Sequence, residues 1–240
     1  SRPKQIAELC ENVRLIHLQA GNRCQINKLA LYAHLDEFYK ELERFRTLES
    51  LDYDLIHSHY WLSGKVGNWA QEHWGVPHVF MFHTVGAVKN ITTGSEKEPE
   101  LRTAVEKYLA SHCDRILVAT DKERDHLMQH YGASPQTIGV VPCGVNLDLF
   151  RPLNQATARR QLGLRQDESI VLFVGRFAPV KGIDRLMEAI AQLQHYERLR
   201  LVIVGGDGSV APEHQRYRRL ARKLSIQDSV SFLGRIEQDK

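Results

Sequence analysis

The chain has 240 residues and therefore room for one large domain or two of moderate size. Hydrophobic residues make up 42% and charged residues 25%, as in soluble globular proteins, and the formal net charge of +3 is too small to indicate nucleic acid as a partner. No apolar run approaches the length of a membrane-spanning helix (about 18 residues), so any membrane contact is expected to be peripheral at most. The four cysteines have neither C-x-x-C nor metal-ligand spacing, which favours reduced thiols in a cytoplasmic protein without a metal site; they are Cys10, Cys24, Cys113 and Cys143.

In the first part of the chain, short apolar runs alternate with amphipathic segments. The apolar runs predict strands at 13–18, 54–57, 78–82, 115–119 and 137–141. Apolar residues at helical spacing predict one helix through 31–45 and further helices at 64–74, 101–113 and 121–131. Thr120 is expected to cap the last of these helices, and Gly75 and Gly132 to end two of them. The polar segment 90–99 is the best candidate for a flexible loop.

A turn-rich break at 142–146 leads into a second part with the same alternation. The pattern predicts strands at 170–174, 199–204 and 229–233, and helices at 156–162, from 184 onward, and at 216–224. The last helix is basic, and its cations are expected to face water, with phosphate or membrane-surface contact as the minor alternative. Strands that alternate with helices indicate an α/β fold with parallel sheets. We therefore predict two domains, 1–145 and 146–240.

The stretch 171–190 is the most informative part of the sequence. A buried strand is followed by the loop Gly175-Arg-Phe-Ala-Pro-Val-Lys-Gly182, and a helix begins near Asp184. In parallel sheets, ligands bind outside the carboxyl ends of the strands, which is where this loop lies. Arg176 and Lys181 can both point at an anion near the helix N-terminus. Two solvated cations are the simpler alternative, but the flanking strand, proline and glycines favour a diphosphate site.

This loop, together with Asp184, resembles the second-domain motif of family 4 glycosyltransferases, which have the GT-B fold. The resemblance implies two Rossmann-like domains with parallel sheets, the first on the acceptor side and the second binding a nucleotide-sugar. It also implies that Arg176 and Lys181 bind the donor diphosphate. Compared with the family, the chain resembles a middle segment that lacks the first βα unit and the last part of the second domain. Both domains are therefore expected to be incomplete, and the segment alone inactive.

Two further runs point to one branch of this family. The runs are Ile56-His-Ser-His-Tyr-Trp-Leu-Ser-Gly64 and Phe82-His-Thr-Val-Gly-Ala-Val-Lys-Asn90, both expected to be loops where they follow strands. They resemble the enzymes that transfer N-acetylglucosamine from a UDP-sugar to inositol phosphate, with sucrose-phosphate synthases as close relatives. By this resemblance His83 touches the donor sugar near its anomeric centre. Taken alone, a histidine in such a place is more often a packed or capping residue.

The same resemblance implies an acceptor-phosphate pocket. Its members are expected to be Lys28, Tyr60, Thr84 and Arg102, of which Arg102 requires a loop two residues shorter than in the relatives. Two cations and two hydroxyl donors near a helix N-terminus suit a phosphate monoester. Each residue also has an ordinary alternative role: surface charge for the two cations, core edge for the tyrosine, and turn residue for the threonine.

On the donor side, the resemblance adds Gly175 and two residues after the last strand, Arg235 and Ile236, which would lie beside the nucleotide base. The sequence 141–146 departs from the family pattern next to its glycine, and the family's sugar-binding glutamate pair would lie beyond the last residue. The Gly-rich turn 205–208 lacks the G-x-G-x-x-G spacing of dinucleotide sites, so no cofactor is expected.

Together with these features, the resemblance implies a retaining glycosyltransferase in which His83, Arg176 and Lys181 carry the chemistry. Its partners would be a UDP-sugar donor and a phosphorylated polyol or sugar acceptor, without nucleic acid. The acceptor could be inositol phosphate or, as in sucrose-phosphate synthases, fructose 6-phosphate. A non-catalytic module that binds nucleotides or sugar phosphates stays open as an alternative, and a homodimer is one open assembly. A GT-B epimerase is disfavoured because it would have no use for a second substrate pocket.

Overall fold

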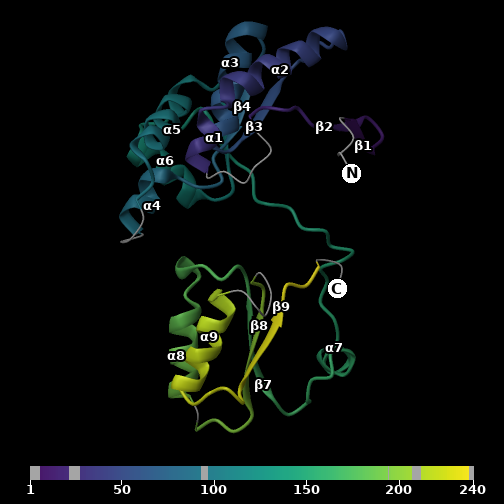
Figure 1. Ribbon diagram of the computed structural model, residues 1–240, viewed down its shortest axis with the longest axis vertical. Helices are drawn as coiled ribbons and strands as arrows, with labels where there is room; N and C mark the ends of the chain where they lie inside the picture. The colour runs from purple at the N-terminus through teal and green to yellow at the C-terminus, as the bar shows by residue number, and fades with distance from the viewer. Residues whose placement is uncertain (1–5, 22–27, 93–96, 194, 207–211, 238–240) are drawn as a thin grey trace. The chain divides into compact units, whose positions relative to one another are not determined.

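The computed structural model describes residues 6–21, 28–92, 97–193, 195–206 and 212–237, and the chain forms two compact units (Figure 1). Unit 1 spans Ser1–Gly144 and unit 2 spans Val145–Lys240. The break between them coincides with the turn-rich segment 142–146, where Pro142, Gly144 and Asn146 interrupt the alternation of strands and helices. Cys24 lies outside the described residues.

Unit 1 is built on a sheet of four parallel strands in the order β3-β4-β5-β6. The strands are β3 (Ile56–His59), β4 (His78–Met81), β5 (Arg115–Val118) and β6 (Ile138–Val140). The helices that connect and follow them are α3 (Tyr60–Trp74), α4 (Gly86–Thr92), α5 (Glu100–His112) and α6 (Asp121–Tyr131). Because all four strands run in the same direction, the segments after His59, Met81 and Val118 meet at one edge of the sheet.

The N-terminal part of unit 1 differs from the predicted pattern in two ways. The strand expected at 13–18 is β2 (Val13–Ile16), but it pairs in antiparallel fashion with β1 (Ile6–Cys10) instead of joining the parallel sheet. The single helix expected through 31–45 is two helices, α1 (Lys28–Tyr32) and α2 (Leu35–Leu48). The predicted caps are confirmed: Thr120 accepts a hydrogen bond from the Glu123 amide at 3.2 Å, and Gly75 and Gly132 end α3 and α6 in the left-handed conformation.

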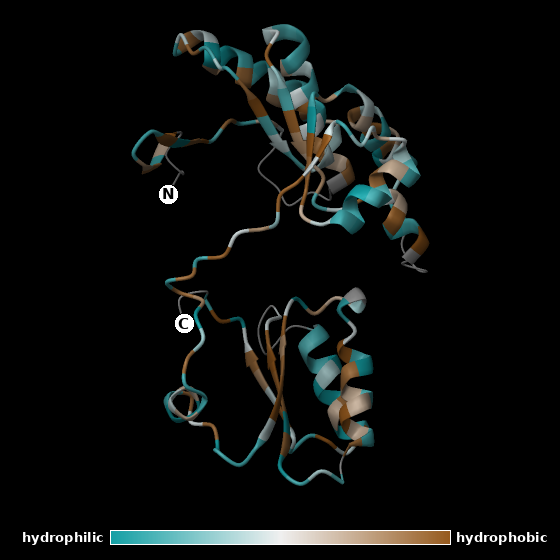
Figure 2. Cartoon of the chain, turned by 180° about the vertical axis from the view of Figure 1, so that it is seen from behind, coloured by the Kyte–Doolittle hydropathy of each residue, from teal (hydrophilic) through white to brown (hydrophobic). Residues whose placement is uncertain are grey.

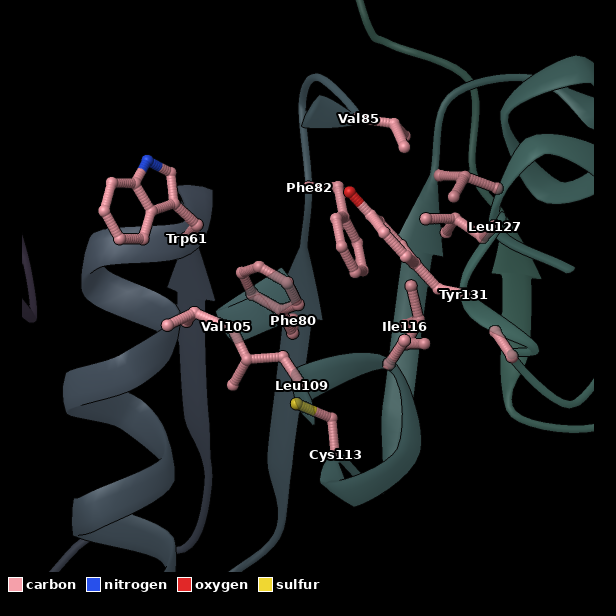
Figure 3. Packing of buried hydrophobic residues seen from close by; sticks show 13 residues of the cluster. Trp61, Phe80, Phe82, Val85, Val105, Leu109, Cys113, Ile116, Leu127 and Tyr131 are labelled. Atoms are coloured by element: carbon pink, nitrogen blue, oxygen red, sulfur yellow. The ribbon is translucent and has the colours of Figure 1, made fainter. Parts of the chain in front are cut away.

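The core of unit 1 lies between the sheet and its helices, where aromatic and aliphatic side chains interlock (Figure 3). Phe80 at the centre of β4 and Leu109 of α5 are both fully buried. Helix α3 approaches β4 closely at Gly64, where an added Cβ atom would lie 2.6 Å from both of these side chains. A larger residue at that position would push the helix away from the strand whose end carries the candidate site.

Unit 2 contains three parallel strands in the order β7-β8-β9. Its elements are α7 (Gln155–Gln161), β7 (Ser169–Val174), the 3₁₀ turn η1 (Pro179–Lys181), α8 (Ile183–Gln192), β8 (Leu199–Val204), α9 (Pro212–Lys223) and β9 (Val230–Gly234). Helices α8 and α9 cover one face of the sheet and turn their apolar sides toward it (Figure 2). As predicted, the cations of α9 are exposed while Tyr217 and Ala221 are buried.

Within the described ranges, no helix is both long enough and apolar enough to span a bilayer. The mixed hydropathy of the helices, with one apolar and one polar side, is visible in both units (Figure 2).

Candidate functional site

Two neighbouring strands of unit 1 end in residues with unusual backbone conformations. Tyr60, directly after β3, has a φ of 73°, and His83, shortly after β4, has a φ of 59°. The left-handed region is unfavourable for non-glycine residues, and it persists only where surrounding contacts enforce it. Such conformations are concentrated at functional sites. The strain therefore marks this edge of the sheet as a candidate site.

Three histidines lie side by side at this edge. The ring centroids of His57 and His59 are 4.2 Å apart, and His59 Nδ1 lies 2.8 Å from His83 Nε2. One ring of the bonded pair must donate and the other accept. Partial burial, together with the nearby rings of His57 and His83, lowers the pKa of His59. The pair therefore fixes the orientation of the His83 imidazole at the strand end.

Arg102 occupies the centre of the site and is 0% exposed. Its Nε donates to Glu106 Oε1 at 2.7 Å, and its Nη1 contacts Tyr60 Oη at 3.2 Å and Glu98 Oε1 at 2.9 Å. Its Nη2 donates to Thr84 Oγ1 at 2.8 Å and to the Thr84 carbonyl at 3.1 Å. These contacts engage all five N–H groups that a guanidinium carries. The Arg102 side chain thus joins β3, β4 and the start of α5 at one point.

Glu106 is the buried counter-charge of Arg102. Its side chain is 1% exposed, and its Oε2 accepts from the Gly86 amide at 2.7 Å and from Tyr131 Oη at 2.5 Å, in addition to the Arg102 bond. Tyr131 also accepts from the Ala87 amide at 3.1 Å, so the first turn of α4 is held by α5 and α6. Burial lowers the pKa of Arg102, but the charge and hydrogen bond of Glu106, together with Tyr60 and Glu98, outweigh it, so the pKa is raised overall. The guanidinium is charged at every relevant pH.

Glu98 lies on the outer side of Arg102, and its side chain is 22% exposed. Its Oε1 contacts Lys89 Nζ at 2.7 Å as well as Arg102 Nη1 at 2.9 Å. Partial burial opposes the negative charge, but Lys89 and Arg102 outweigh it and hold the pKa of Glu98 below its usual value. The Asn90 side chain donates through Nδ2 to the Glu98 carbonyl at 3.3 Å and accepts through Oδ1 from the Glu98 amide at 2.5 Å, which fixes the position of Glu98 relative to α4.

Three of the four residues predicted to bind the acceptor phosphate therefore meet: Tyr60, Thr84 and Arg102. Lys28 begins α1, and its side chain lies outside the described part of the chain. The prediction of loops was wrong in two places, because α3 begins already at Tyr60 and α4 occupies 86–92. A hydroxyl that accepts from a guanidinium still has a hydrogen to donate, and Thr84 is exposed, so its Oγ1 can donate to a phosphate oxygen.

Sequence reasoning missed three residues of the network: Glu98, Glu106 and Tyr131. The two glutamates stand four residues before and after Arg102, a spacing at which helical side chains of opposite charge pair. That signal was available in the sequence. Tyr131 lies 25 residues from Glu106, so no sequence spacing indicates that the two side chains form a hydrogen bond.

In unit 2, the ends of the three parallel strands form a hollow. It is lined by Gly175 and Arg176 after β7, Gly205 and Gly206 after β8, Arg235 and Ile236 after β9, and Val174 and Val204. Four of the five residues predicted to bind the donor thus lie around one cavity. The fifth, Lys181, ends η1, is separated from α8 by Gly182, and is exposed like Arg176. Within the described residues, no hydrogen bond or ion pair engages the side chain of either cation.

The loop that carries these cations is held by its neighbours. Phe177 packs edge-on against Tyr217 with ring centroids 5.3 Å apart, so the inner side of the loop is anchored in the core. Gly205 has a φ of 128°, and a Cβ atom there would lie 1.9 Å from the Gly175 carbonyl oxygen. Only glycine allows the two loops to approach this closely. Arg176 is therefore presented on a rigid backbone despite its exposed side chain.

Comparison with known families decides the classification. A model described as Glycosyltransferase Family 4 matches residues 8–149, more than half of the chain. The chain belongs to glycosyltransferase family 4. A second model, described as Glycosyl transferases group 1, matches residues 154–240. Among the described residues, no cluster of histidine, cysteine or acidic side chains could hold a metal ion.

Several curated relatives in this family carry the same name. A D-inositol 3-phosphate glycosyltransferase 2 of Catenulispora acidiphila is 39% identical over 97% of this chain and 57% of its own length. A D-inositol 3-phosphate glycosyltransferase of Streptomyces bingchenggensis is 42% identical over 97% of this chain and 53% of its own length. The chain spans little more than half the length of these relatives.

Solved structures agree on the fold. The sucrose-phosphate synthase of Thermosynechococcus elongatus is similar over 99% of this chain and 59% of its own, with a TM-score of 0.88 and 32% identity. The Anabaena protein HepE, solved with UDP and glucose, has a TM-score of 0.67 over 88% of this chain and 54% of its own. At 18% identity this second likeness supports the fold alone. The predicted GT-B class, with parallel sheets in Rossmann-like units, is confirmed.

Proposed function

We propose that the whole protein is a retaining glycosyltransferase that moves a sugar from a UDP-sugar to a phosphorylated polyol or sugar. The observation that carries the proposal is the convergence of Tyr60, Thr84 and Arg102 beside the His59–His83 pair. Two hydroxyls backed by a guanidinium form a site for a phosphate monoester. An imidazole held at the adjacent strand end can contact the sugar that is transferred. The names of the relatives at 39% and 42% identity favour D-inositol 3-phosphate as the acceptor.

The donor would bind at the hollow of unit 2. In the transfer, the bond between the anomeric carbon and the diphosphate oxygen breaks, and a bond to an acceptor oxygen forms on the same face of the sugar. The acceptor proton passes to the departing phosphate oxygen. Negative charge grows on that diphosphate, and the exposed cations Arg176 and Lys181 would stabilise it, with His83 orienting the sugar. Gly175, Arg235 and Ile236 would contact the rest of the nucleotide.

Fructose 6-phosphate is the second candidate acceptor, because a sucrose-phosphate synthase is similar over 99% of this chain. That likeness favours transfer of glucose to fructose 6-phosphate. Both acceptors carry a phosphate monoester, so the proposed pocket suits either. The bond that forms and the cations that stabilise the leaving group would be the same.

The test measures UDP release by the whole protein. Each of several UDP-sugars is combined with D-inositol 3-phosphate, fructose 6-phosphate and their unphosphorylated forms. We expect turnover with one phosphorylated acceptor and a loss of about 100- to 1000-fold in kcat for Arg176→Ala. Arg185→Ala, which removes an exposed cation from the nearby helix α8, is the matched control and should retain activity. Equal turnover with unphosphorylated acceptors would contradict the phosphate pocket, and UDP binding without any turnover would leave only a binding module.

The acceptor pocket is tested separately with Thr84→Val, which removes an exposed hydroxyl but keeps the Thr84 carbonyl that accepts from Arg102 Nη2. Circular dichroism checks that this variant is folded. A hydrogen bond to a charged group contributes about 1.5–3 kcal/mol, so KM for the phosphorylated acceptor should rise on the order of 10- to 100-fold. KM for the UDP-sugar should stay the same. A rise in KM for the UDP-sugar alone would contradict this role, because Thr84 would then contact the donor and not the acceptor.

A further inference from the structure

The partners of Arg102 differ in how firmly they are held. Glu106 is 1% exposed and receives three hydrogen bonds, so it is part of the interior. Tyr60 and Thr84 are neutral hydroxyl partners on the ends of the strands. Glu98 is the charged partner on the outer side, 22% exposed, and it stands in the short segment between α4 and α5. If any partner of Arg102 is replaced by a ligand, it is Glu98.

The contacts of Glu98 are those that a phosphate oxygen would make. A single oxygen, Oε1, lies 2.7 Å from Lys89 Nζ and 2.9 Å from Arg102 Nη1. An anion placed between an ammonium and a guanidinium is also how proteins hold phosphate monoesters. The carboxylate carries one negative charge, whereas a phosphate monoester carries about two near neutral pH and has three acceptor oxygens.

Arg102 needs such a partner when no ligand is bound. The guanidinium is 0% exposed, and an unpaired buried charge is strongly unfavourable. Glu106 matches its charge but is shared with the amide of Gly86 and the hydroxyl of Tyr131. A second carboxylate on the outer side satisfies the remaining Nη1 hydrogen until a stronger anion arrives.

We propose that Glu98 is an internal competitor for the acceptor phosphate: its carboxylate occupies the place of a phosphate oxygen and leaves Arg102 and Lys89 when the acceptor binds. This inference rests on the proposed function and assigns a regulatory residue to the same site. Binding of the acceptor then includes the cost of breaking two ion pairs of Glu98. Glu98 therefore lowers the affinity of the site for phosphate and keeps its cations paired while the site is empty.

The test titrates inorganic phosphate into the whole protein by calorimetry, for wild type, Glu98→Gln and Glu98→Ala. Removing the competing charge should tighten phosphate binding on the order of 10-fold in both variants. Glu100→Gln removes an exposed negative charge two residues away and is the matched control; its phosphate affinity should change by less than about twofold. Circular dichroism confirms that each variant is folded.

The outcomes separate the inference from the function on which it rests. Tighter binding in both Glu98 variants, with a lower KM for the phosphorylated acceptor, supports the competitor. Phosphate that binds wild type but binds the Glu98 variants equally or more weakly overturns it, because Glu98 would then support the pocket; the pocket itself would stand. Phosphate that binds none of the four proteins overturns the proposed pocket and the inference with it.

Discussion

The two candidate sites differ in where their cations find counter-charge. In unit 1, Arg102 is buried and fully paired with protein groups before any ligand is present. In unit 2, the side chains of Arg176 and Lys181 are exposed, and no described residue forms an ion pair with them. The first arrangement fixes geometry, and the second leaves positive charge available.

This difference indicates that the buried cation of unit 1 mainly stabilises the fold, whereas the exposed cations of unit 2 mainly serve binding and catalysis. A buried and saturated cation stabilises the fold around it, so its removal should first affect folding. An exposed cation on a rigid loop contributes little to stability, so its removal should first affect binding and catalysis. The comparison can be tested unit by unit, because all three tryptophans (Trp61, Trp69 and Trp74) lie in unit 1. Within this chain, tryptophan fluorescence therefore reports unfolding of unit 1 alone.

The largest effect on stability is expected for Arg102→Ala. The substitution leaves the charge of Glu106 buried without its guanidinium, and breaking a buried pair in this way costs about 3–5 kcal/mol of unfolding free energy. Urea unfolding followed by tryptophan fluorescence measures this loss. Arg124→Ala in α6 breaks only partly exposed pairs with Asp121 and Asp125 and should cost at most about 1 kcal/mol.

Equal losses of unfolding free energy in Arg102→Ala and Arg124→Ala would contradict the proposed difference between the two sites, because Arg102 would then behave like a surface residue. The complementary measurement uses Arg176→Ala, whose thermal unfolding by circular dichroism should match that of wild type although its activity is lost. A large stability loss for Arg176→Ala would show that the loop of unit 2 depends on its cation for structure.

A pH effect of intermediate size is expected from His78. Its imidazole is 0% exposed and lies 2.6 Å from Ser58 Oγ through Nε2. Burial lowers its pKa from 6.5 to about 4, with a smaller contribution from His57, while Asp114 acts in the opposite direction. Because the folded-state pKa lies below the unfolded value, protonation favours the unfolded chain. Unit 1 should be fully stabilised above pH 6.5 and lose up to about 3 kcal/mol as the pH falls through 4.

The measurement is the urea midpoint of tryptophan fluorescence between pH 7 and pH 4. His78→Gln keeps a hydrogen-bonding side chain that does not titrate, so its stability should fall less steeply over this range. His112→Gln, at the exposed end of α5, should retain the steepness of wild type. Identical pH profiles for wild type and His78→Gln would show that other groups cause the acid sensitivity.

The order and type of the longer elements could be predicted because apolar periodicity and caps act locally, as at Thr120 and Gly132. Helix α4 could not, because its stability comes from distant residues: Glu106 and Tyr131 bind the amides of Gly86 and Ala87. The antiparallel pairing of β1 with β2 was missed for a similar reason, since it places β2 outside the main sheet.

The candidate site was predictable in part. The resemblance of the sequence led to Tyr60, Thr84 and Arg102, and the structure brings them together. What the residues alone could not show is that Arg102 is buried and saturated, with two glutamates among its partners, because burial depends on how α4, α5 and the strand ends pack. Whether these residues bind the acceptor phosphate stays a prediction.

A smaller stability loss than that of Arg102→Ala is expected for Tyr131→Phe, which probes the layer behind Arg102. The hydroxyl of Tyr131 donates to Glu106 and accepts from the Ala87 amide, so its loss should cost about 1.5–3 kcal/mol by the same fluorescence assay. Tyr108→Phe, whose hydroxyl is 3.5 Å from Glu72 at the surface, should cost less than about 0.5 kcal/mol. If Tyr131→Phe also raises KM for the phosphorylated acceptor, the interior network positions Arg102 for binding. If stability falls and KM does not change, the network acts on the fold alone. The two sites then differ fully in role: the buried network of unit 1 stabilises the fold, and the exposed cations of unit 2 are available for ligand binding.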